Sequence, residues 1–381
     1  MSRLTDNFRV NLSIVVITHN REPMVRRLVD TIKTEAKSYK MGEVEILIIN
    51  SSKSKLFDKE NSIKEIHVPG IVKASSKRNL GLKYAKHDWI VYIDDDCIIK
   101  RGSLNIIAEY ILKYNGKDIA GFYGVTEFYG VQKLPFKACN NTHWTEDFYW
   151  ASNKKELLWG PTSIAIFRKD VLNEIHGFDE SFEIPVGSED VDIGIRINKA
   201  GYRLYGIPKV LVYHDVSTWN TYWKNLKRFF RYGMGDVFLQ LKRPDFTYLK
   251  LSSIALILSI ILLMLGLLFL YTKSLSRIVL YIPIYIIFSF LFSSIYYYYN
   301  YKKSPHESII LKLYDLSSEF GKLFASIKKR KVKPMFFLAK YTPYGTKKRL
   351  LGRETIIYGE ELPDLLALAI AFIVLIIIGG I

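Results

Sequence analysis

The chain has 381 residues, a formal net charge of +17 at pH 7 and 49% hydrophobic residues, a length that accommodates one large domain or two modest ones. Two cysteines are too few for a disulfide framework and fit a reducing compartment. The basic excess accompanies no nucleic-acid motif, and much of it flanks apolar runs, where anionic lipid headgroups are the simpler partner. We therefore expect no nucleic acid among the partners.

The first hundred residues alternate between two patterns. Short apolar runs at 13–18, 45–50 and 89–94 end in polar residues, as buried parallel strands do. Stretches with helical spacing, at 24–32 and 73–86, separate them. Strands that alternate with helices predict an α/β fold with a mostly parallel sheet.

Asp94, Asp95 and Asp96 close the third apolar run. Three adjacent carboxylates repel one another unless a cation or strong donors offset their charge. Because ligands collect outside the carboxyl ends of parallel strands, this is where a site is expected. Strand alternation predicts that Asp94 and Asp96 point together and Asp95 points away. Such oxygen ligands suit Mg²⁺ or Mn²⁺ with a phosphate-bearing substrate, and the alternative is a solvated acidic turn.

The periodicity fades between 132 and 159, where aromatic and polar residues mix, and loop-rich regions of this kind often carry specificity. Beyond residue 213, Trp219, Trp223, Leu226 and Phe230 are spaced for one helix face, with basic residues elsewhere around the helix. This pattern predicts a basic amphipathic helix in the membrane interface over 219–250. The alternative is an ordinary amphipathic helix on the surface of a domain.

Three uncharged apolar runs follow, at 251–271, 278–300 and 365–381, the last at the low end of spanning length. Their length predicts transmembrane helices, and the alternative is buried core helices. The segment 301–364 is rich in basic residues, whereas the link 272–277 is short and carries few. By the positive-inside rule, we expect the N-terminal α/β region and the loop 301–364 on the cytoplasmic side. No apolar stretch precedes the first strand, so we expect no signal peptide.

Several motifs together resemble the family 2 glycosyltransferases, which have the GT-A fold and use nucleotide-sugars. They are Ser13-Ile-Val-Val-Ile-Thr-His-Asn-Arg-Glu22, Ala74-Ser-Ser-Lys-Arg-Asn-Leu-Gly81, the Asp94–Asp96 run and Gly187-Ser-Glu-Asp-Val-Asp192, in that order. Gly177-Phe-Asp-Glu180, Arg196, Gly201-Tyr202 and the segment from Pro208 to His214 agree further. The resemblance covers residues 11–216.

The resemblance implies a nucleotide-sugar site with Mn²⁺ or Mg²⁺. Its donor-binding residues are Thr18, His19, Asn20, Arg21, Asn50, Arg78, Asp94 and Asp95, and its metal ligands are Asp94, Asp96 and His214. Many relatives carry Asp where this chain has Asn50, and an amide can both accept and donate, so the base stays open. For His214 alone, a structural role is an equal alternative.

The resemblance also assigns the catalytic base to Asp190, beside Glu189, and the acceptor side to Gly160, Thr162 and Trp159. An inverting transfer needs a base to deprotonate the acceptor hydroxyl. The alternative for Glu189 and Asp190 is a charged helix start that the helix dipole favours. For Trp159 the alternative is a core aromatic.

The sequence therefore predicts a GT-A domain at 1–218 in the cytoplasm, an interfacial segment at 219–250, two transmembrane helices within 251–300, a basic cytoplasmic loop at 301–364 and a C-terminal transmembrane helix at 365–381. The expected activity is inverting transfer of a sugar from a nucleotide-diphosphate sugar to polyprenyl phosphate or a lipid-linked saccharide at the cytoplasmic face.

Three alternatives stay open. A processive polysaccharide synthase resembles this family but carries a Gln-x-x-Arg-Trp motif, whereas here Gln240-Leu-Lys-Arg243 precedes Pro244. A non-catalytic membrane scaffold that retains the fold has no need of both acidic motifs. A dinucleotide-dependent oxidoreductase is disfavoured because no G-x-G-x-x-G follows the first strand.

Overall fold

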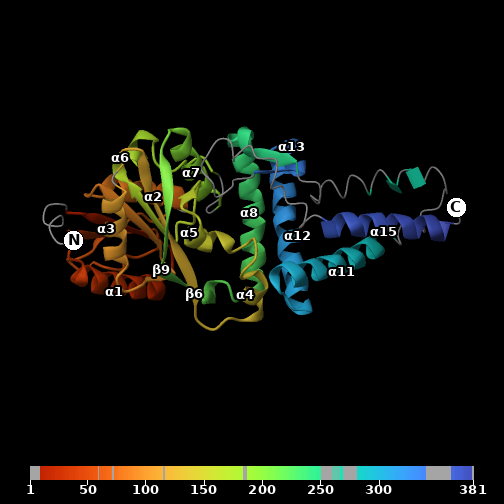
Figure 1. The fold of residues 1–381 in the computed structure, drawn as a ribbon, viewed down its shortest axis with the longest axis horizontal. Coiled ribbons are helices and arrows are strands. Elements are labelled where there is room, and N and C mark those ends of the chain that lie inside the picture. The colour runs from red at the N-terminus through yellow and green to blue at the C-terminus, as the bar shows by residue number, and fades with distance from the viewer. Residues whose placement is uncertain are drawn as a thin grey trace. The chain divides into compact units, whose positions relative to one another are not determined.

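The computed structural model describes residues 9–58, 60–70, 73–114, 116–182, 187–249, 281–339 and 362–379, with five further residues between 261 and 268. The chain divides into two compact units (Figure 1). The first, which we call the sheet unit, comprises 1–132, 145–218 and 341–350. The second, the helical unit, comprises 133–144, 219–340 and 351–381.

A nine-stranded sheet with the order β3-β2-β1-β4-β8-β6-β9-β5 forms the centre of the sheet unit, and β7 pairs with β9. The strands are β1 Leu12–Thr18, β2 Val44–Asn50, β3 Lys64–His67, β4 Trp89–Asp94, β5 Cys97–Ile99, β6 Ile119–Tyr129, β7 Glu156–Leu157, β8 Ile164–Arg168 and β9 Arg203–Asp215. Strands β1 to β4 are parallel, and so are β6 and β9, whereas β8 runs antiparallel to both of its neighbours. Because Ile17 pairs with Asp94 and Thr18 with Asn50, three strands end at one edge.

Helices cover both faces of this sheet (Figure 1). On one face, α1 Glu22–Ser38 and α3 Ser103–Lys113 bury residues such as Leu28 and Ile107. On the other face, α2 Ala74–Tyr84, α6 Lys169–Glu174 and α7 Glu189–Lys199 bury residues such as Leu82 and Ile193. Short elements fill the connections: η1 Glu146–Tyr149, α5 Trp150–Asn153 and η2 Val216–Thr218. The predicted α/β class with a mostly parallel sheet is confirmed.

The helical unit contains α4 Leu134–Cys139, α8 Tyr222–Lys242, η3 Pro244–Phe246, α11 Tyr281–Tyr301, α12 Pro305–Lys328, α13 Lys333–Phe336 and α15 Leu362–Gly379, with β10 Thr247–Leu249 antiparallel to β11 Phe337–Ala339. Helix α12 lies within the range that we expected to be a loop. Its start is well defined, since Ser304 and Glu307 form a reciprocal capping box and Pro305 takes the first helical position.

The predicted amphipathic helix is present as α8, but it begins later than its apolar spacing suggested. Trp219 precedes the helix and is 2% exposed, packed against Phe136 and under the guanidinium of Arg228. Trp223 is 73% exposed. The expectation that the two tryptophans share one apolar face is therefore wrong, because the helical turn that would align them does not exist before Tyr222.

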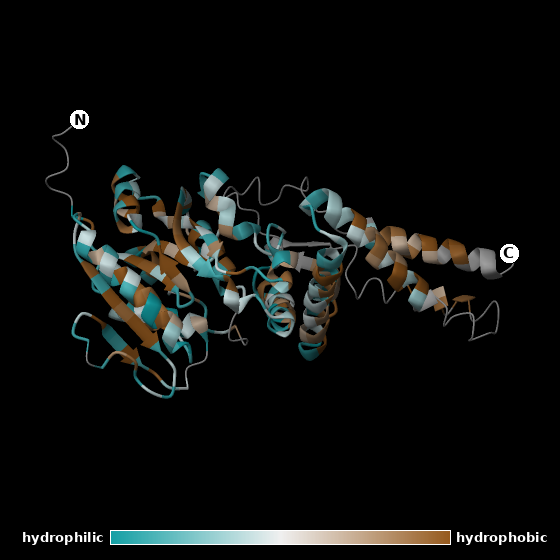
Figure 2. Cartoon of the chain, turned by 90° about the horizontal axis from the view of Figure 1, so that it is seen from below, coloured by the Kyte–Doolittle hydropathy of each residue, from teal (hydrophilic) through white to brown (hydrophobic). Residues whose placement is uncertain are grey.

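No helix among the residues that the structure describes combines the length and the hydropathy needed to cross a membrane. The predicted spans at 278–300 and 365–381 correspond to α11 and α15, which are rich in apolar residues (Figure 2). Residues 251–260, and most of those from there to 280, lie outside the described residues. None of the three predicted spans is thus confirmed.

Candidate active site

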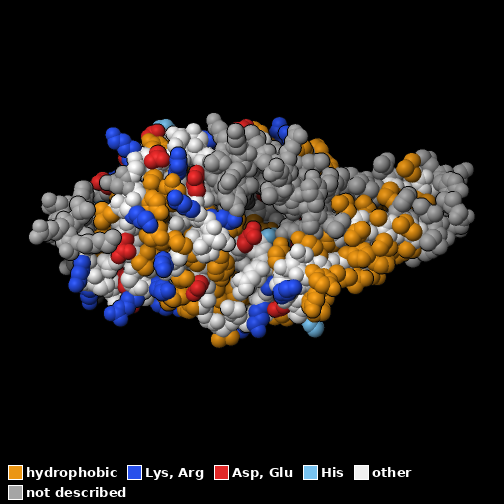
Figure 3. Space-filling view, in the orientation of Figure 1, with side chains coloured by type: hydrophobic (Ala, Val, Ile, Leu, Met, Phe, Trp, Pro, Cys, Tyr) orange, Lys and Arg blue, Asp and Glu red, His pale blue; other side chains and the backbone are white. Residues whose placement is uncertain are grey.

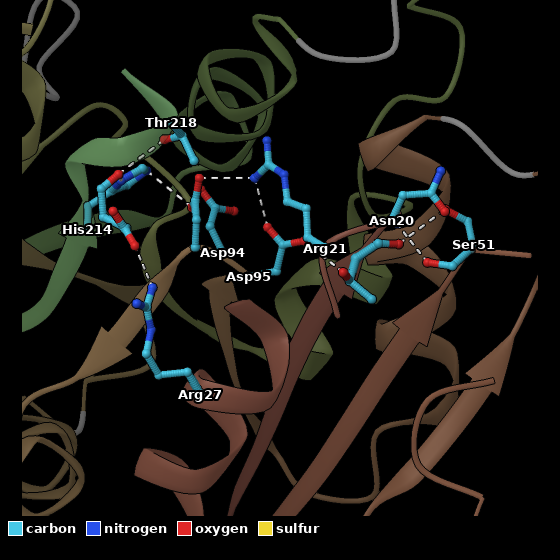
Figure 4. Close-up of polar contacts among 12 residues, drawn as sticks. Asn20, Arg21, Arg27, Ser51, Asp94, Asp95, His214 and Thr218 are labelled. Carbon is cyan, nitrogen blue, oxygen red and sulfur yellow. Dashed lines mark hydrogen bonds and ion pairs between the residues drawn. The ribbon is translucent and has the colours of Figure 1, made fainter. Parts of the chain in front are cut away.

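The acidic run lies at the carboxyl edge of the sheet, as predicted. Its side chains do not alternate as predicted, because Asp95 and Asp96 both contact Arg21. Asp94 is the last residue of β4, and Asp95 and Asp96 form the turn that follows. Arg21 Nη1 donates to Asp95 Oδ1 at 2.9 Å and to Asp96 Oδ2 at 3.0 Å (Figure 4). Thr18 Oγ1 donates to Asp95 Oδ2 at 2.7 Å. The predicted alternation is wrong because it holds only within a strand, and this strand ends at Asp94.

Burial dominates the protonation of these carboxyls. It raises the pKa of Asp95 to about 6, with the charge of Asp96 adding to the rise and Arg21 opposing it. Burial likewise raises the pKa of Asp94, which Arg78 opposes. Arg21 and Arg78 therefore offset the desolvation of these carboxylates only in part, and a further cation would stabilise their charged form.

Arg78, on α2, connects the acidic run to the start of α7. Its Nη1 donates to Glu189 Oε1 at 2.8 Å, and its Nη2 donates to Thr162 Oγ1 at 2.6 Å and reaches Asp94 Oδ1 at 3.4 Å. The Arg78 side chain is only 6% exposed, and the backbone oxygen of Arg78 accepts from Tyr92. One buried guanidinium thus brings together two acidic groups that lie almost a hundred residues apart in the sequence.

Glu189 and Asp190 begin α7, directly after a tight turn. Ser188 has a left-handed backbone with φ of 65°, and the N–H of Gly187 donates to Glu189 Oε2 at 2.8 Å. Burial raises the pKa of Asp190 to about 7, with the charge of Glu189 adding to the rise and Arg78 opposing it. A carboxyl with this pKa can hold or release a proton near neutral pH, as a general base must.

Asp96 and His214 could hold a metal ion. Asp96 Oδ1 lies 3.3 Å from His214 Nε2, and the Sγ of Cys97 joins the pair so that the three ligand atoms lie within 4.8 Å of one another. A carboxylate and an imidazole are a donor set that fits Mn²⁺. Burial raises the pKa of the Cys97 thiol well above its usual range, and sulfur is a softer ligand than Mn²⁺ or Mg²⁺ prefers. Asp94, the third predicted ligand, lies toward Arg78 instead.

The ends of β1 and β2 are joined by the residues that we expected near the nucleotide. His19 Nδ1 lies 3.1 Å from the backbone oxygen of Ser51, and the N–H of Asn20 donates to Ser52 Oγ at 2.7 Å (Figure 4). Asn20 adopts a left-handed backbone with φ of 55°, which an Asn tolerates well.

Asn50 is fully engaged within its own loop. Its Oδ1 accepts from the N–H of Ser52, and its Nδ2 donates to the backbone oxygen of Ser54 and to Glu65. The side chain is completely buried. In this structure the amide therefore shapes the loop after β2, and its donors and acceptor are already used.

Of the three residues that we expected on the acceptor side, Thr162 contacts Arg78 directly, whereas Gly160 and Trp159 pack against other aromatic side chains. A Cβ on Gly160 would lie 2.6 Å from the ring of Tyr123. Trp159 is 6% exposed, with its ring edge-on to Trp150 at 5.1 Å between centroids. The indole of Trp159 faces the interior in this structure.

Three further residues at the site were not predicted. Lys77 Nζ lies 3.3 Å from the backbone oxygen of Thr18 and 3.2 Å from Ser51 Oγ, and burial lowers its pKa to about 8. Burial also raises the pKa of Asp147, with Asp190 adding to the rise. Cys97 is the third. Lys77 lies within the motif Ala74–Gly81 and Cys97 directly follows the acidic run, so their positions were the available signal, whereas Asp147 lies in the loop-rich region without any pattern.

Known proteins resemble this chain in sequence and in fold. The chain is 22% identical over 233 residues to rhamnosyltransferase WbbL of Escherichia coli (strain K12). The matched region covers 53% of this chain and 82% of WbbL. The mannosyltransferase PcManGT from Pyrobaculum calidifontis, solved in complex with GDP-Man and Mn²⁺, has the same fold with a TM-score of 0.52, at 14% identity over 84% of this chain and 88% of that chain. GalNAc-T7, solved with UDP, GalNAc and Mn²⁺, matches with a TM-score of 0.42 and 14% identity. The match covers 54% of this chain and 43% of GalNAc-T7.

A family comparison covers the acidic run, Arg78's partners at the start of α7, and His214. The sequence model of glycosyl transferase family group 2 matches residues 89–299, which is more than half of the chain. The chain belongs to glycosyl transferase family group 2.

Proposed function

We propose that this chain is a metal-dependent, inverting glycosyltransferase. It transfers a sugar from a nucleotide-diphosphate sugar to a membrane-associated acceptor, either a polyprenyl phosphate or a lipid-linked saccharide, at the cytoplasmic face. Family membership supports the transferase activity. The donor type is supported by PcManGT, whose structure contains GDP-Man and Mn²⁺.

The observation that carries the proposal is the pair of contacts made by Arg78. Through Glu189 and Asp94 it links the group of residues suited to the catalytic base with the acidic run suited to the donor. An inverting transfer requires these two functions to face each other across the anomeric carbon. A scaffold that had lost catalysis would have no need to retain both acidic motifs.

In the proposed reaction, Asp190 takes the proton of the acceptor hydroxyl. Its pKa of about 7 makes it a carboxylate at slightly alkaline pH, yet basic enough to accept a proton in the transition state. Burial is the main cause of that pKa, the charge of Glu189 raises it further, and Arg78 opposes the rise. If the acceptor is an anionic phosphate, the proton transfer is unnecessary, and Asp190 then matters less.

The donor diphosphate would lie over the acidic run. Asp96 and His214 would hold a divalent cation, which would supply Lewis-acid neutralisation of the charge on the departing nucleotide. Arg21, which bridges Asp95 and Asp96, provides a second cation at the same edge. Thr18 and the loops after β1 and β2 then lie on the side of the nucleoside.

The acceptor proposal is supported by the sequence downstream of the sheet unit. Residues 251–271 contain no charged side chain, and basic residues dominate 301–364. A segment of this kind keeps the active site near a bilayer, where a polyprenyl-linked acceptor is concentrated, and the charge distribution favours the cytoplasmic side.

A processive synthase is the second candidate, and the chain argues against it. Gln240, the residue closest to the synthase motif, donates to Asp236 Oδ2 at 2.7 Å and to the backbone oxygen of Phe337 at 2.9 Å. It therefore serves the packing of the helical unit. Product length in the assay below decides between single and repeated transfer.

The test is sugar transfer by the purified full-length chain, with a panel of UDP-, GDP- and dTDP-sugars, with Mn²⁺ or Mg²⁺, and with a polyprenyl phosphate in mixed micelles. We expect one donor to be consumed only when metal is present, and we expect Asp96→Ala to abolish both nucleotide binding and transfer. Glu109→Gln, on the far side of the sheet, is the matched control and should behave as the wild type. If no donor is consumed and Asp96→Ala leaves nucleotide binding unchanged, the proposal is wrong.

A further inference from the structure

Helix α12 presents apolar side chains outward. Ile309, Leu313, Phe320, Phe324 and Ile327, which we call the α12 stripe, are each between 43% and 61% exposed. Their spacing of three, four and seven residues places them along one side of the helix. No charged residue interrupts this side between Ile309 and Ile327.

The buried side of α12 carries charged side chains as well as the apolar Leu311 and Tyr314. Lys312 Nζ contacts Asp364 Oδ1 at 2.6 Å and Oδ2 at 2.7 Å, and Lys322 Nζ lies 3.7 Å from Asp236 Oδ2. Lys312 is 4% exposed and Lys322 is 3% exposed. In water a helix buries its apolar side and exposes its charges, so the polarity of α12 is inverted.

Helices α11 and α15 have the same inversion. On α11, Ser289 and Ser293 are buried, whereas Ile287, Leu291 and Ile295 are at least 46% exposed. On α15 the small residues Ala367 and Ala371 are buried, as is the charged Asp364, whereas Ile373 is exposed. Small and polar residues inside and large aliphatic residues outside are typical of helices that pack in lipid. Figure 2 shows α11 and α15 as largely hydrophobic, and Figure 3 shows hydrophobic side chains gathered over this part of the chain.

Basic side chains border the α12 stripe at its C-terminal end. Lys328, Arg330, Lys331 and Lys333 are all exposed. The described residues of α8, which packs along α12, add three further exposed cations: Lys224, Lys227 and Arg231. The α12 stripe and the basic side chains beside it are together complementary to a bilayer surface that contains anionic lipid.

We infer that the α12 stripe lies in the boundary between headgroups and acyl chains of an anionic bilayer, with the basic residues at 328–333 against the headgroups. This assigns a lipid-contacting role to a segment that the sequence alone indicated to be a cytoplasmic loop. The inference rests on the membrane-associated acceptor proposed above and identifies the surface that holds the enzyme near it.

A second copy of the chain is a poorer occupant of this surface. A symmetric dimer that paired the α12 stripes with their helices parallel would bring the basic residues at 328–333 of both copies together, and like charges across an interface oppose association. A bilayer also explains why the inverted polarity extends to α11 and α15, because lipid can contact several helices at once.

The experiment places an environment-sensitive thiol-reactive fluorophore at Phe324→Cys or Ile327→Cys in the full-length chain. The native Cys97 and Cys139 are both fully buried, so the label goes to the introduced cysteine. The labelled protein is reconstituted in vesicles that contain phosphatidylglycerol and phosphatidylcholine, and quenching by brominated lipid is compared with quenching by aqueous iodide. Val131→Cys, at an apolar position of the sheet unit that is 78% exposed, is the matched control.

We expect bromolipid to quench the α12 labels several-fold more than the Val131→Cys label, with iodide showing the reverse order. We also expect the bromolipid quenching to weaken in vesicles of phosphatidylcholine alone. Quenching of the α12 labels by iodide would overturn the inference, and so would protection from both quenchers, which would indicate a protein partner.

Sugar transfer is measured on the same vesicles, so that the two proposals fail separately. If the α12 labels report water while the sugar is transferred, only the lipid-contacting surface is wrong. If they report lipid while no donor is consumed, the proposed function is wrong and the surface stands.

Discussion

At the scale of single residues, Arg78 has the most contacts with the predicted site. It is buried and bonds to Glu189, Thr162 and Asp94. Removing one partner of a buried ion pair leaves the other charge uncompensated, and this typically costs 3–5 kcal/mol. The stability of the sheet unit and the position of Glu189, beside the proposed base Asp190, therefore depend on the same guanidinium.

We accordingly expect Arg78→Met to lower the free energy of unfolding by about 3–5 kcal/mol, and Arg78→Met with Glu189→Gln to cost less than the sum of the single variants. Unfolding monitored by circular dichroism provides the measurement. Arg78→Lys keeps the charge but loses the fork that reaches two partners, so it should fall between wild type and Arg78→Met. Additive effects of the two substitutions would contradict the pairing.

The second prediction concerns pH. Because a base acts only when deprotonated and burial raises the pKa of Asp190 to about 7, the rate of transfer to a hydroxyl acceptor should rise through pH 7 and then level off. Glu189→Gln removes a neighbouring negative charge, which lowers the pKa of Asp190 and moves the rising part of the profile to lower pH. The pH dependence of kcat/KM checks this, with Glu109→Gln as the control. An unshifted profile would show that Asp190 is not the titrating group.

The third prediction concerns Lys77, whose pKa burial lowers from 10.5 to about 8. Since the unfolded chain keeps this proton up to a higher pH than the folded chain, the buried charge destabilises the fold at pH 7, and the cost disappears between pH 8 and 10.5. Lys77→Met should therefore stabilise the protein by about 2–3 kcal/mol at pH 7 and by much less at pH 10.

Thermal unfolding at the two pH values measures the difference. Lys83→Met, at an exposed position of the same helix, controls for the loss of one positive charge. Stabilisation that is equal at pH 7 and pH 10 would mean that the charge of Lys77 is not the cause.

Residue types and their order were enough to predict which side chains meet at this edge of the sheet, and the contacts that were not predicted have physical causes. Thr18, Arg21, Asp95 and Asp96 meet because parallel strands end at one edge, a rule that the sequence pattern carries. Asn50 can contact a nucleotide base only if its side-chain amide has no other partner. The sequence does not show that this amide bonds to Ser52, Ser54 and Glu65. Contacts between groups distant in the chain, such as Asp147 with Asp190, leave no periodic signal.

At the scale of elements, the ends of strands and helices account for the differences from the prediction. The β4 strand stops at Asp94, so the next two carboxylates follow turn geometry, and both turn toward Arg21. Helix α12 was not expected because basic residues at 328–331 dominated the composition of its segment. Its apolar spacing is visible in the sequence, but the inverted polarity becomes apparent only when α8 and α15 are seen against its other side.

The packing of α8 against α12 supports a fourth prediction. A Cβ on Gly321 would lie 1.9 Å from the backbone oxygen of Phe230, and a Cβ on Gly233 would lie 1.8 Å from that of Ser318. Gly321→Ala should lower the free energy of unfolding by about 1–3 kcal/mol through overpacking, despite the better helix propensity of Ala. Leu313→Ala, at an exposed position of the same helix, is the control and should change stability far less. A Gly321→Ala variant as stable as wild type would mean that these helices are not this close.

At the scale of the whole molecule, the two units are interleaved in sequence. The chain leaves the sheet unit at residue 132, contributes 133–144 to the helical unit, and returns before it leaves again at residue 219. The segment 133–144 is held by partners that come much later. Trp144 Nε1 donates to Asp315 Oδ1 at 2.7 Å, its ring packs 4.4 Å from that of Phe229, and Tyr314 donates to the backbone oxygen of Pro135.

A chain that ends at Thr218 would therefore keep 133–144 but lose α8 and α12. Phe136 and Cys139, both fully buried in the complete chain, would be exposed, and Trp144 would lose its ring contact and its hydrogen-bond acceptor. Exposed apolar side chains at the end of β6 favour aggregation. We expect this truncated chain to unfold at a lower temperature than the full chain and to elute as aggregates in size-exclusion chromatography.

Replacing 133–144 in the truncated chain with a short Gly/Ser linker removes those side chains and should restore a monodisperse species, because the sheet and its covering helices lie outside the replaced segment. If the unmodified truncated chain is already monodisperse and equally stable, the contacts of 133–144 with α8 and α12 contribute little to the fold.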